Sequence, residues 1–107
     1  MTGHELISLM HQSHRRVHIT GTPENGVIAA LDLEGRLFAV INGRVLNRVV
    51  PSAITNRSNK NAFLNPGGDA LWPAPEGTCF GYEYAAGKWR VPPAITGAVW
   101  EVAEYST

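Results

Sequence analysis

Residues 65–77 carry the side chains of this chain that are best suited to binding a sugar. The segment reads Asn-Pro-Gly-Gly-Asp-Ala-Leu-Trp-Pro-Ala-Pro-Glu-Gly, so Asp69, Trp72 and Glu76 stand on a backbone stiffened by three prolines. A tryptophan ring stacks on the C–H face of a sugar, and carboxylates accept hydrogen bonds from its hydroxyls. The alternative is that Trp72 packs in the core, Asp69 caps a turn and Glu76 is solvated.

The amino-terminal segment is the second place where side-chain types could do chemistry. It contains all four histidines of the chain: His4, His11, His14 and His18. If residues 4–18 form one helix, a rotation of ~100° per residue gathers these imidazoles in one quadrant. Neutral imidazole is a common metal ligand, but two arginines lie beside His14 and acidic partners are scarce on that face. We therefore expect a short amino-terminal helix without a metal site.

Other reactive groups and partners find little support in the sequence. Cys79 is the single cysteine, so no internal disulfide can form, and we expect a buried, inert thiol. Nine basic residues balance nine acidic ones without a basic stripe, which argues against a nucleic-acid partner. The chain contains neither a phosphate loop, nor a secretory signal, nor the run of ~20 apolar residues that spans a membrane. We expect a cytoplasmic protein without a cofactor.

The segments that must position these residues predict an antiparallel β fold. Three apolar runs, at residues 27–33, 37–41 and 45–50, are separated by Glu34-Gly35 and Asn42-Gly43. Asn-Gly between two β-rich runs indicates a hairpin, because a type I′ turn needs a positive φ at both central residues. The first two runs alternate poorly between apolar and polar residues, which predicts cover on both faces of the sheet.

The second half of the chain predicts loops and further strands. These are, in order, a polar loop at 55–61, a shaped loop at 65–77, a hairpin around Gly87-Lys88 and a strand at 96–105. The division expected from this pattern is a helical segment at residues 1–20, followed by an all-β domain at residues 21–107.

Residues 65–76 resemble the Gly-Gly-x-x-Leu-Trp-Pro-Ala-Pro-Glu signature of an uncharacterised bacterial family with a galactose-mutarotase-like fold. Less closely, the strand at residues 43–46 and the tryptophan and prolines of residues 89–93 are similar to further segments of that family. The resemblance covers residues 26–107 and implies an antiparallel β-sandwich, part of a supersandwich with a sugar-binding groove on one sheet. Domains of that family are longer than this chain, so we expect either part of a larger protein or a short relative of the family.

The resemblance also implies a set of groove-lining residues. Asp69, Glu76 and Arg44 would form hydrogen bonds with a sugar, and Trp72 and Trp89 would stack on it. The function expected first is therefore carbohydrate binding. An aldose 1-epimerase-type enzyme is the first alternative, using Glu76 or Asp69 together with a histidine from the amino-terminal segment or from a second chain.

A non-catalytic interaction domain is the second alternative. Here the carboxy-terminal strand at 96–105 pairs with another subunit, because an open strand edge is normally covered. Sugar binding predicts that Trp72 is partly exposed in a groove beside Asp69 and Glu76. The interaction hypothesis predicts instead that Trp72 is buried and that exposed apolar side chains lie along residues 99–105.

Overall fold

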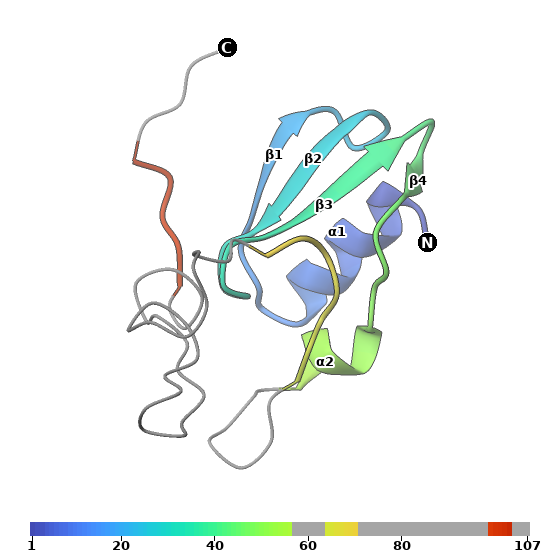
Figure 1. The fold of residues 1–107 in the computed structure, drawn as a ribbon. Helices are drawn as coiled ribbons and strands as arrows, with labels where there is room; N and C mark the ends of the chain where they lie inside the picture. Colours follow the sequence, from blue (N-terminus) through green and yellow to red (C-terminus); the bar gives the residue numbers. More distant parts are fainter. Residues whose placement is uncertain (57–63, 71–98, 104–107) are drawn as a thin grey trace, which may run out of the picture.

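The computed structural model describes residues 1–56, 64–70 and 99–103 (Figure 1). Within these residues, four antiparallel strands form one sheet in the order β1-β2-β3-β4, and two short helices accompany it. The elements are α1 (Gly3–Gln12), β1 (Val17–Gly21), β2 (Gly26–Ala30), β3 (Arg36–Ile41), β4 (Arg44–Val45) and α2 (Pro51–Thr55). The predicted antiparallel sheet and amino-terminal helix are confirmed. The part of the chain described contains no second sheet, so the sandwich stays a prediction.

Helix α1 begins with reciprocal hydrogen bonds at its amino end. The Thr2 hydroxyl accepts a hydrogen bond from the Glu5 backbone N–H at 3.1 Å, and the Glu5 carboxylate accepts one from the Thr2 N–H at 3.3 Å. This capping box satisfies backbone donors that the helix itself leaves unpaired. The hydrogen bond to Thr2 lowers the pKa of Glu5, so the cap is fully formed at neutral pH.

The predicted helix at residues 4–18 is wrong in its second half. Helix α1 ends at Gln12, and His14 takes a positive φ of 57° as the chain reverses. Residues from Val17 onward then form β1, which pairs with β2 in the register Val17↔Ala30. The segment Val-His-Ile-Thr is rich in β-branched residues, which suit a strand, and cross-strand contacts outweigh its continuation as a helix.

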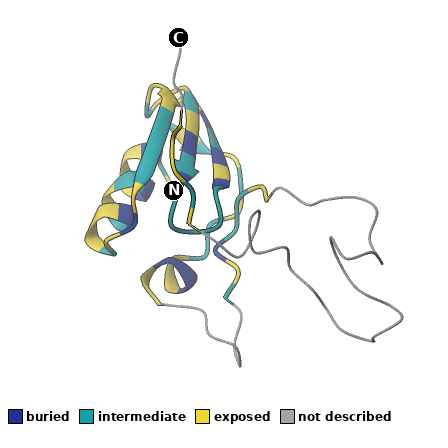
Figure 2. Ribbon diagram, turned by 90° about the vertical axis from the view of Figure 1, so that its left-hand side faces the viewer, coloured by how far each residue is buried: buried dark blue, intermediate teal, exposed yellow. Residues whose placement is uncertain are grey.

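The sheet has one face that packs against α1. Residues on this face alternate along β2 and β3 and meet apolar side chains of both helices in a single cluster. The fully or nearly fully buried members are Leu6, Met10, Ile28, Ala30, Phe38, Val40 and Ile54. Figure 2 shows α1 on one side of the strands, with buried positions turned toward them. Helix α1 therefore shares one hydrophobic core with the sheet.

The opposite face of the sheet, here called the outer face, is also apolar. On this face Val27 and Ala29 of β2 pair with Ala39 and Leu37 of β3, and Ile41 follows along β3. The polar residues His18 and Thr20 of β1 lie opposite Ala29 and Val27 on the same face. The sequence predicts that other elements pack on both faces of the sheet, and α1 packs on the inner one. On the outer face, however, Leu37 is 45% exposed and Ile41 is 53% exposed.

Two predicted turns connect the strands as expected. Asn42 and Gly43, between β3 and β4, have φ values of 49° and 80°, and Glu34 and Gly35, between β2 and β3, have φ values of 60° and 65°. Asn42-Gly43 is the predicted two-residue turn with positive φ at both central residues, and the β3–β4 hairpin is confirmed. Strands β2 and β3 also pair as an antiparallel hairpin, but the predicted strand at residues 27–33 is too long: β2 ends at Ala30, and residues 31–35 form the connecting loop.

The predicted third strand at residues 45–50 is shorter than expected. Strand β4 contains only Arg44–Val45, and Leu46 adds one further backbone hydrogen bond, to the Ala39 carbonyl at 2.9 Å. The Asn47 side chain takes the place of a strand neighbour by accepting a hydrogen bond from the Ala39 N–H at 2.7 Å. Pro51 then begins α2 at the point where the sequence predicts the end of a strand, because proline is well suited to a first helical turn.

Segment 64–70 occupies the part of the β3 edge that β4 leaves open. Asp69 and Leu37 exchange backbone hydrogen bonds of 2.8 and 3.0 Å, and Val50 donates its N–H to the Pro66 carbonyl at 3.0 Å. The segment therefore lies between β3 and the chain that leads into α2. Most of the predicted polar loop at 55–61 and the hairpin around Gly87-Lys88 lie outside the described residues.

The predicted strand at residues 96–105 is not seen where the structure describes it. Residues 99–103 belong to no strand, and their position is set instead by contacts with the beginning of β1 and the end of β2. In the part of the chain that the structure describes, neither helix has the length and hydrophobicity that crossing a membrane requires.

Candidate functional site

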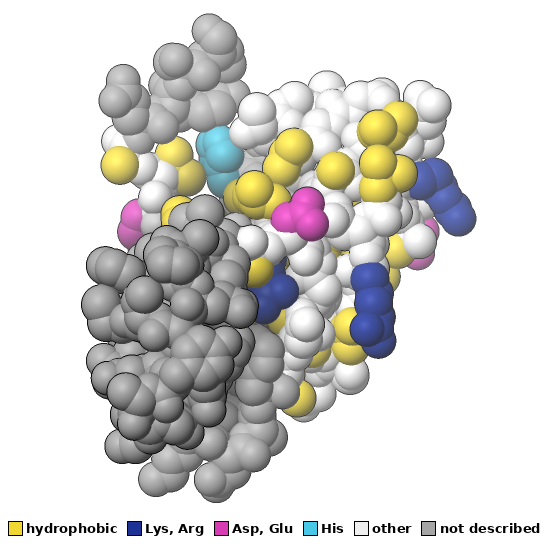
Figure 3. All heavy atoms as spheres, viewed as in Figure 1, with side chains coloured by type: hydrophobic (Ala, Val, Ile, Leu, Met, Phe, Trp, Pro, Cys, Tyr) yellow, Lys and Arg dark blue, Asp and Glu magenta, His cyan; other side chains and the backbone are white. Residues whose placement is uncertain are grey.

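A pocket lies on the outer face of the sheet, at the end of β3 that is nearest α2. It encloses about 360 Å³, which is at the lower end of the roughly 300–1,000 Å³ of small-molecule sites. Its described walls are Ala29, Leu31, Gly35, Leu37, Asp69, Ala70 and Trp100. Figure 3 looks onto this face and shows hydrophobic side chains gathered there, with an acidic side chain among them.

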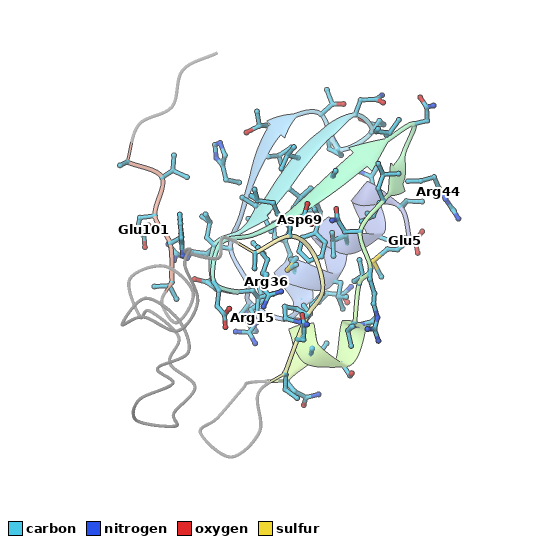
Figure 4. All side chains as sticks on the ribbon, viewed as in Figure 1. Glu5, Arg15, Arg36, Arg44, Asp69 and Glu101 are labelled. Carbon is cyan, nitrogen blue, oxygen red and sulfur yellow. The ribbon has the colours of Figure 1, made fainter. Side chains whose placement is uncertain are left out.

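Asp69 reaches the pocket because of its pairing with β3. Residues directly opposite each other in an antiparallel pair project to the same face, so Asp69 shares the face of Leu37, and Leu37 shares that of Ala29. Figure 4 shows Asp69 in front of the sheet. Asp69 is an exposed residue, so a ligand in the pocket can reach it. The predicted site residue Asp69 thus lines the pocket.

The Gly67-Gly68 pair allows segment 64–70 to approach its neighbours closely. The two residues have φ values of 92° and 71°, a region that favours glycine. A Cβ atom at Gly67 would lie 1.9 Å from the Arg48 carbonyl oxygen, and one at Gly68 would lie 2.9 Å from the Leu37 carbonyl oxygen. The two glycines of the sequence signature therefore bring Asp69 to the sheet edge.

Arg36 fixes the same segment from the core side of the sheet. The residue is 8% exposed, and its Nη1 atom donates to the Asn65 side-chain oxygen at 3.1 Å and to the Gly67 carbonyl at 3.3 Å. Its Nη2 lies 3.5 Å from a carboxylate oxygen of Glu34. Burial raises the pKa of Glu34 even though the Arg36 charge acts in the opposite direction. Arg36 is thus a positioning residue that sequence reasoning missed.

Trp100 forms the wall opposite the sheet. Its backbone N–H donates to the Leu31 carbonyl at 2.7 Å, and its indole ring lies against Gly35 so closely that a Cβ there would be 2.7 Å from the ring. The sequence assigns Trp100 to a strand and not to the site. Because the indole is placed by residues far away in the chain, no local signal identifies it as a pocket residue.

An ion-pair cluster around Arg16 holds the backbone next to Trp100. The guanidinium lies 2.7 Å from an Asp32 carboxylate oxygen and 2.8 Å from one of Glu101, and it also donates to the Trp100 carbonyl at 3.4 Å. The hydrogen bond from Arg16 holds the pKa of Asp32 below its ordinary value, and the two carboxylates raise the pKa of Arg16. The Arg16 charge is therefore engaged by two acids.

The structure does not bring the other predicted site residues to Asp69. Arg44 pairs with Ile41, whereas Asp69 pairs with Leu37. At ~3.3 Å per residue along β3, this difference of four residues amounts to ~13 Å. Figure 4 accordingly shows Arg44 at the far end of the sheet, near Glu5. The remaining predicted residues lie outside the described part of the chain: Trp72, Glu76 and Trp89, as does Cys79.

The four histidines do not form the predicted cluster. His4 and His11 lie on α1, His14 lies in the turn that follows it, and His18 lies on β1. The Nε2 atom of His4 lies 2.5 Å from a carboxylate oxygen of Glu24, and this contact lowers the pKa of Glu24. Among the described residues, no three His, Cys, Asp or Glu side chains lie close enough to bind a metal ion together.

In chemical terms, the described walls of the pocket combine an apolar floor with one carboxylate and one indole. Such walls suit a small molecule that has both an apolar face and hydrogen-bond donors. No protein-family model, curated protein or solved structure matches this chain. The likeness of residues 26–107 to galactose-mutarotase-like proteins therefore stays a prediction from the sequence motif.

Proposed function

We propose that this chain is a carbohydrate-binding domain similar to galactose-mutarotase-like proteins, and that the pocket on the outer face is its sugar site. The observation that carries this proposal is that Asp69 and Trp100 line the same apolar pocket. Apolar side chains of the floor accommodate the C–H face of a sugar ring, the indole adds a flat aromatic surface, and the carboxylate accepts hydrogen bonds from hydroxyls. The volume of about 360 Å³ suits a simple sugar better than a long polymer.

The pocket has too few described titratable groups for acid–base catalysis, which favours a binding function over an enzymatic one. Opening a sugar ring by acid–base catalysis requires a general acid and a general base, each within reach of its own proton. Among the described lining residues, Asp69 is the only titratable side chain. The epimerase hypothesis therefore requires a second group in addition to those that line the pocket here.

The sandwich belongs to the same proposal. The outer face keeps Leu37 and Ile41 about half exposed, although they belong to a continuous apolar surface with Val27 and Ala39. Sheets with two apolar faces are normally covered on both. A second layer over this face would deepen the pocket beside Asp69 and Trp100.

Replacing Asp69 with asparagine tests the sugar site. The variant keeps the size of the side chain but loses the charge, so affinity for a bound hexose should fall about tenfold, which corresponds to roughly 1.4 kcal/mol for a hydrogen bond to a charged group. The measurement is calorimetric titration with a panel of simple hexoses. Glu24→Gln, at the β1–β2 turn, is the matched control and should bind like the parent. Unchanged affinity in Asp69→Asn would contradict the proposed site, as would a parent protein that binds no hexose.

A second candidate function, association with another subunit, is supported by the exposure of the carboxy-terminal segment. Val99 is 60% exposed and Val102 is 43% exposed, which is where the interaction hypothesis predicts apolar side chains. Light scattering should then show a dimer, and the double variant Val99→Ser, Val102→Ser should be monomeric. A parent protein that remains monomeric at high concentration would exclude association between copies of the chain.

A further inference from the structure

The charged side chains in and around the pocket bear on the class of sugar that it could bind. Asp69 is the only charged side chain among its described lining residues. Two described arginines beside the pocket are engaged by other groups: Arg36 donates to Asn65 and to the Gly67 carbonyl from the core side of the sheet, and Arg16 lies between Asp32 and Glu101. Among the described lining residues, an anionic ligand would therefore meet a carboxylate and no positively charged side chain.

We propose that the pocket binds sugars carrying a protonated amino group in preference to neutral or anionic sugars. This inference rests on the proposed function, because it names the class of sugar that the same site takes. The Asp69 carboxylate can accept a charge-assisted hydrogen bond from an ammonium group, and such bonds are stronger than those with a neutral hydroxyl. The Trp100 indole supplies the aromatic ring that a cation favours over an anion.

The apolar surroundings strengthen this preference. Ala29, Leu31, Leu37 and Ala70 form the rest of the described side-chain walls, so a bound ligand displaces water from apolar side chains beside Asp69. With less water between them, opposite charges attract each other more strongly than at a fully hydrated surface. These four side chains carry no hydrogen-bond donor for a phosphate or carboxylate group on a sugar.

Calorimetric titration of the intact chain with three related ligands tests the preference. At about pH 6, where an amino group of this kind carries its proton, D-glucosamine should bind about fivefold more tightly than D-glucose, the factor for roughly 1 kcal/mol. D-Glucuronate should bind more weakly than D-glucose. N-Acetyl-D-glucosamine, in which acetylation removes the charge, is the matched ligand control and should lose the advantage.

Two further measurements, at different salt concentrations and with the Asp69→Asn variant, test whether the Asp69 charge causes the preference for glucosamine. The advantage of glucosamine over glucose should shrink between about 0.02 and 0.5 M salt, because ions screen an accessible charge pair. It should disappear in Asp69→Asn and persist in Glu24→Gln. Equal affinity of the parent for glucosamine and glucose would overturn this inference while leaving the sugar site intact. A preference that survives in Asp69→Asn would also overturn it, whereas the absence of binding by every sugar would instead overturn the proposed function.

Discussion

Replacing Phe38 with alanine is expected to lower the free energy of unfolding by about 3–5 kcal/mol. Phe38 has 0% exposure and is among the largest fully buried side chains of the core between the sheet and α1. The loss combines the transfer free energy of the ring with the cost of the cavity it leaves. A domain of this size has a stability of about 5–15 kcal/mol, so the variant should be only marginally folded. Urea denaturation followed by circular dichroism measures the change.

The neighbouring Leu37 provides the control for this experiment. It belongs to the same strand but projects to the outer face, where it is 45% exposed, so Leu37→Ala should cost about 1 kcal/mol or less. A similar loss in both variants would indicate that a second layer covers the outer face. A loss below about 1 kcal/mol in Phe38→Ala would contradict the position of the core.

Replacing Gly67 with alanine is expected to cost more than about 2 kcal/mol and to weaken sugar binding as well. The residue has a φ of 92°, and its new Cβ would lie 1.9 Å from the Arg48 carbonyl oxygen, a backbone atom that cannot rotate away. Segment 64–70 would have to leave the edge of β3 and carry Asp69 out of the pocket. Thermal unfolding and hexose titration of the same preparation measure the two effects.

Gly43→Ala separates the two causes of this loss. Gly43 has a φ of 80°, yet a Cβ there would meet no heavy atom within 4 Å. This control therefore keeps the conformational strain of alanine at positive φ, about 1–2 kcal/mol, without the collision. Hexose affinity should stay at the parent value in Gly43→Ala. Equal stability losses in the two variants would show that the close approach to Arg48 contributes nothing.

The parts of the fold that the sequence predicts are those decided locally. Asn42-Gly43 specifies the two-residue turn between β3 and β4, and Glu34-Gly35 ends the loop between β2 and β3. Both can be predicted locally, because few residues tolerate positive φ. The end of the amino-terminal helix depends on distant residues: periodicity extends the predicted helix to residue 18, but pairing with β2 makes residues 17–21 a strand. The third strand is shortened for a similar reason, since segment 64–70 competes for the edge of β3.

In the candidate site, too, residues placed by local sequence could be predicted and residues placed by distant contacts could not. Asp69 could be predicted because a proline- and glycine-rich segment with a carboxylate has a local signature. Trp100 could not, because its place depends on contacts with Gly35, Leu31 and Arg16 across a long stretch of chain. Arg44 was predicted from a motif that carries no information on strand register, and the register puts it at the other end of β3.

The placement of Trp100 next to Arg16 has a consequence for the order in which the protein assembles. Hairpins of neighbouring strands close short loops and form early, whereas the contact between Arg16 and Trp100 joins residues 84 positions apart and carries the larger entropy of loop closure. The sheet can therefore be complete before the Trp100 wall of the pocket arrives. In native-state hydrogen exchange, we expect the Trp100 amide to exchange through an opening of lower free energy than the amides of β2 and β3. A ligand that contacts both Asp69 and Trp100 would therefore link the segment containing Trp100, which docks late, to the sheet, which forms early.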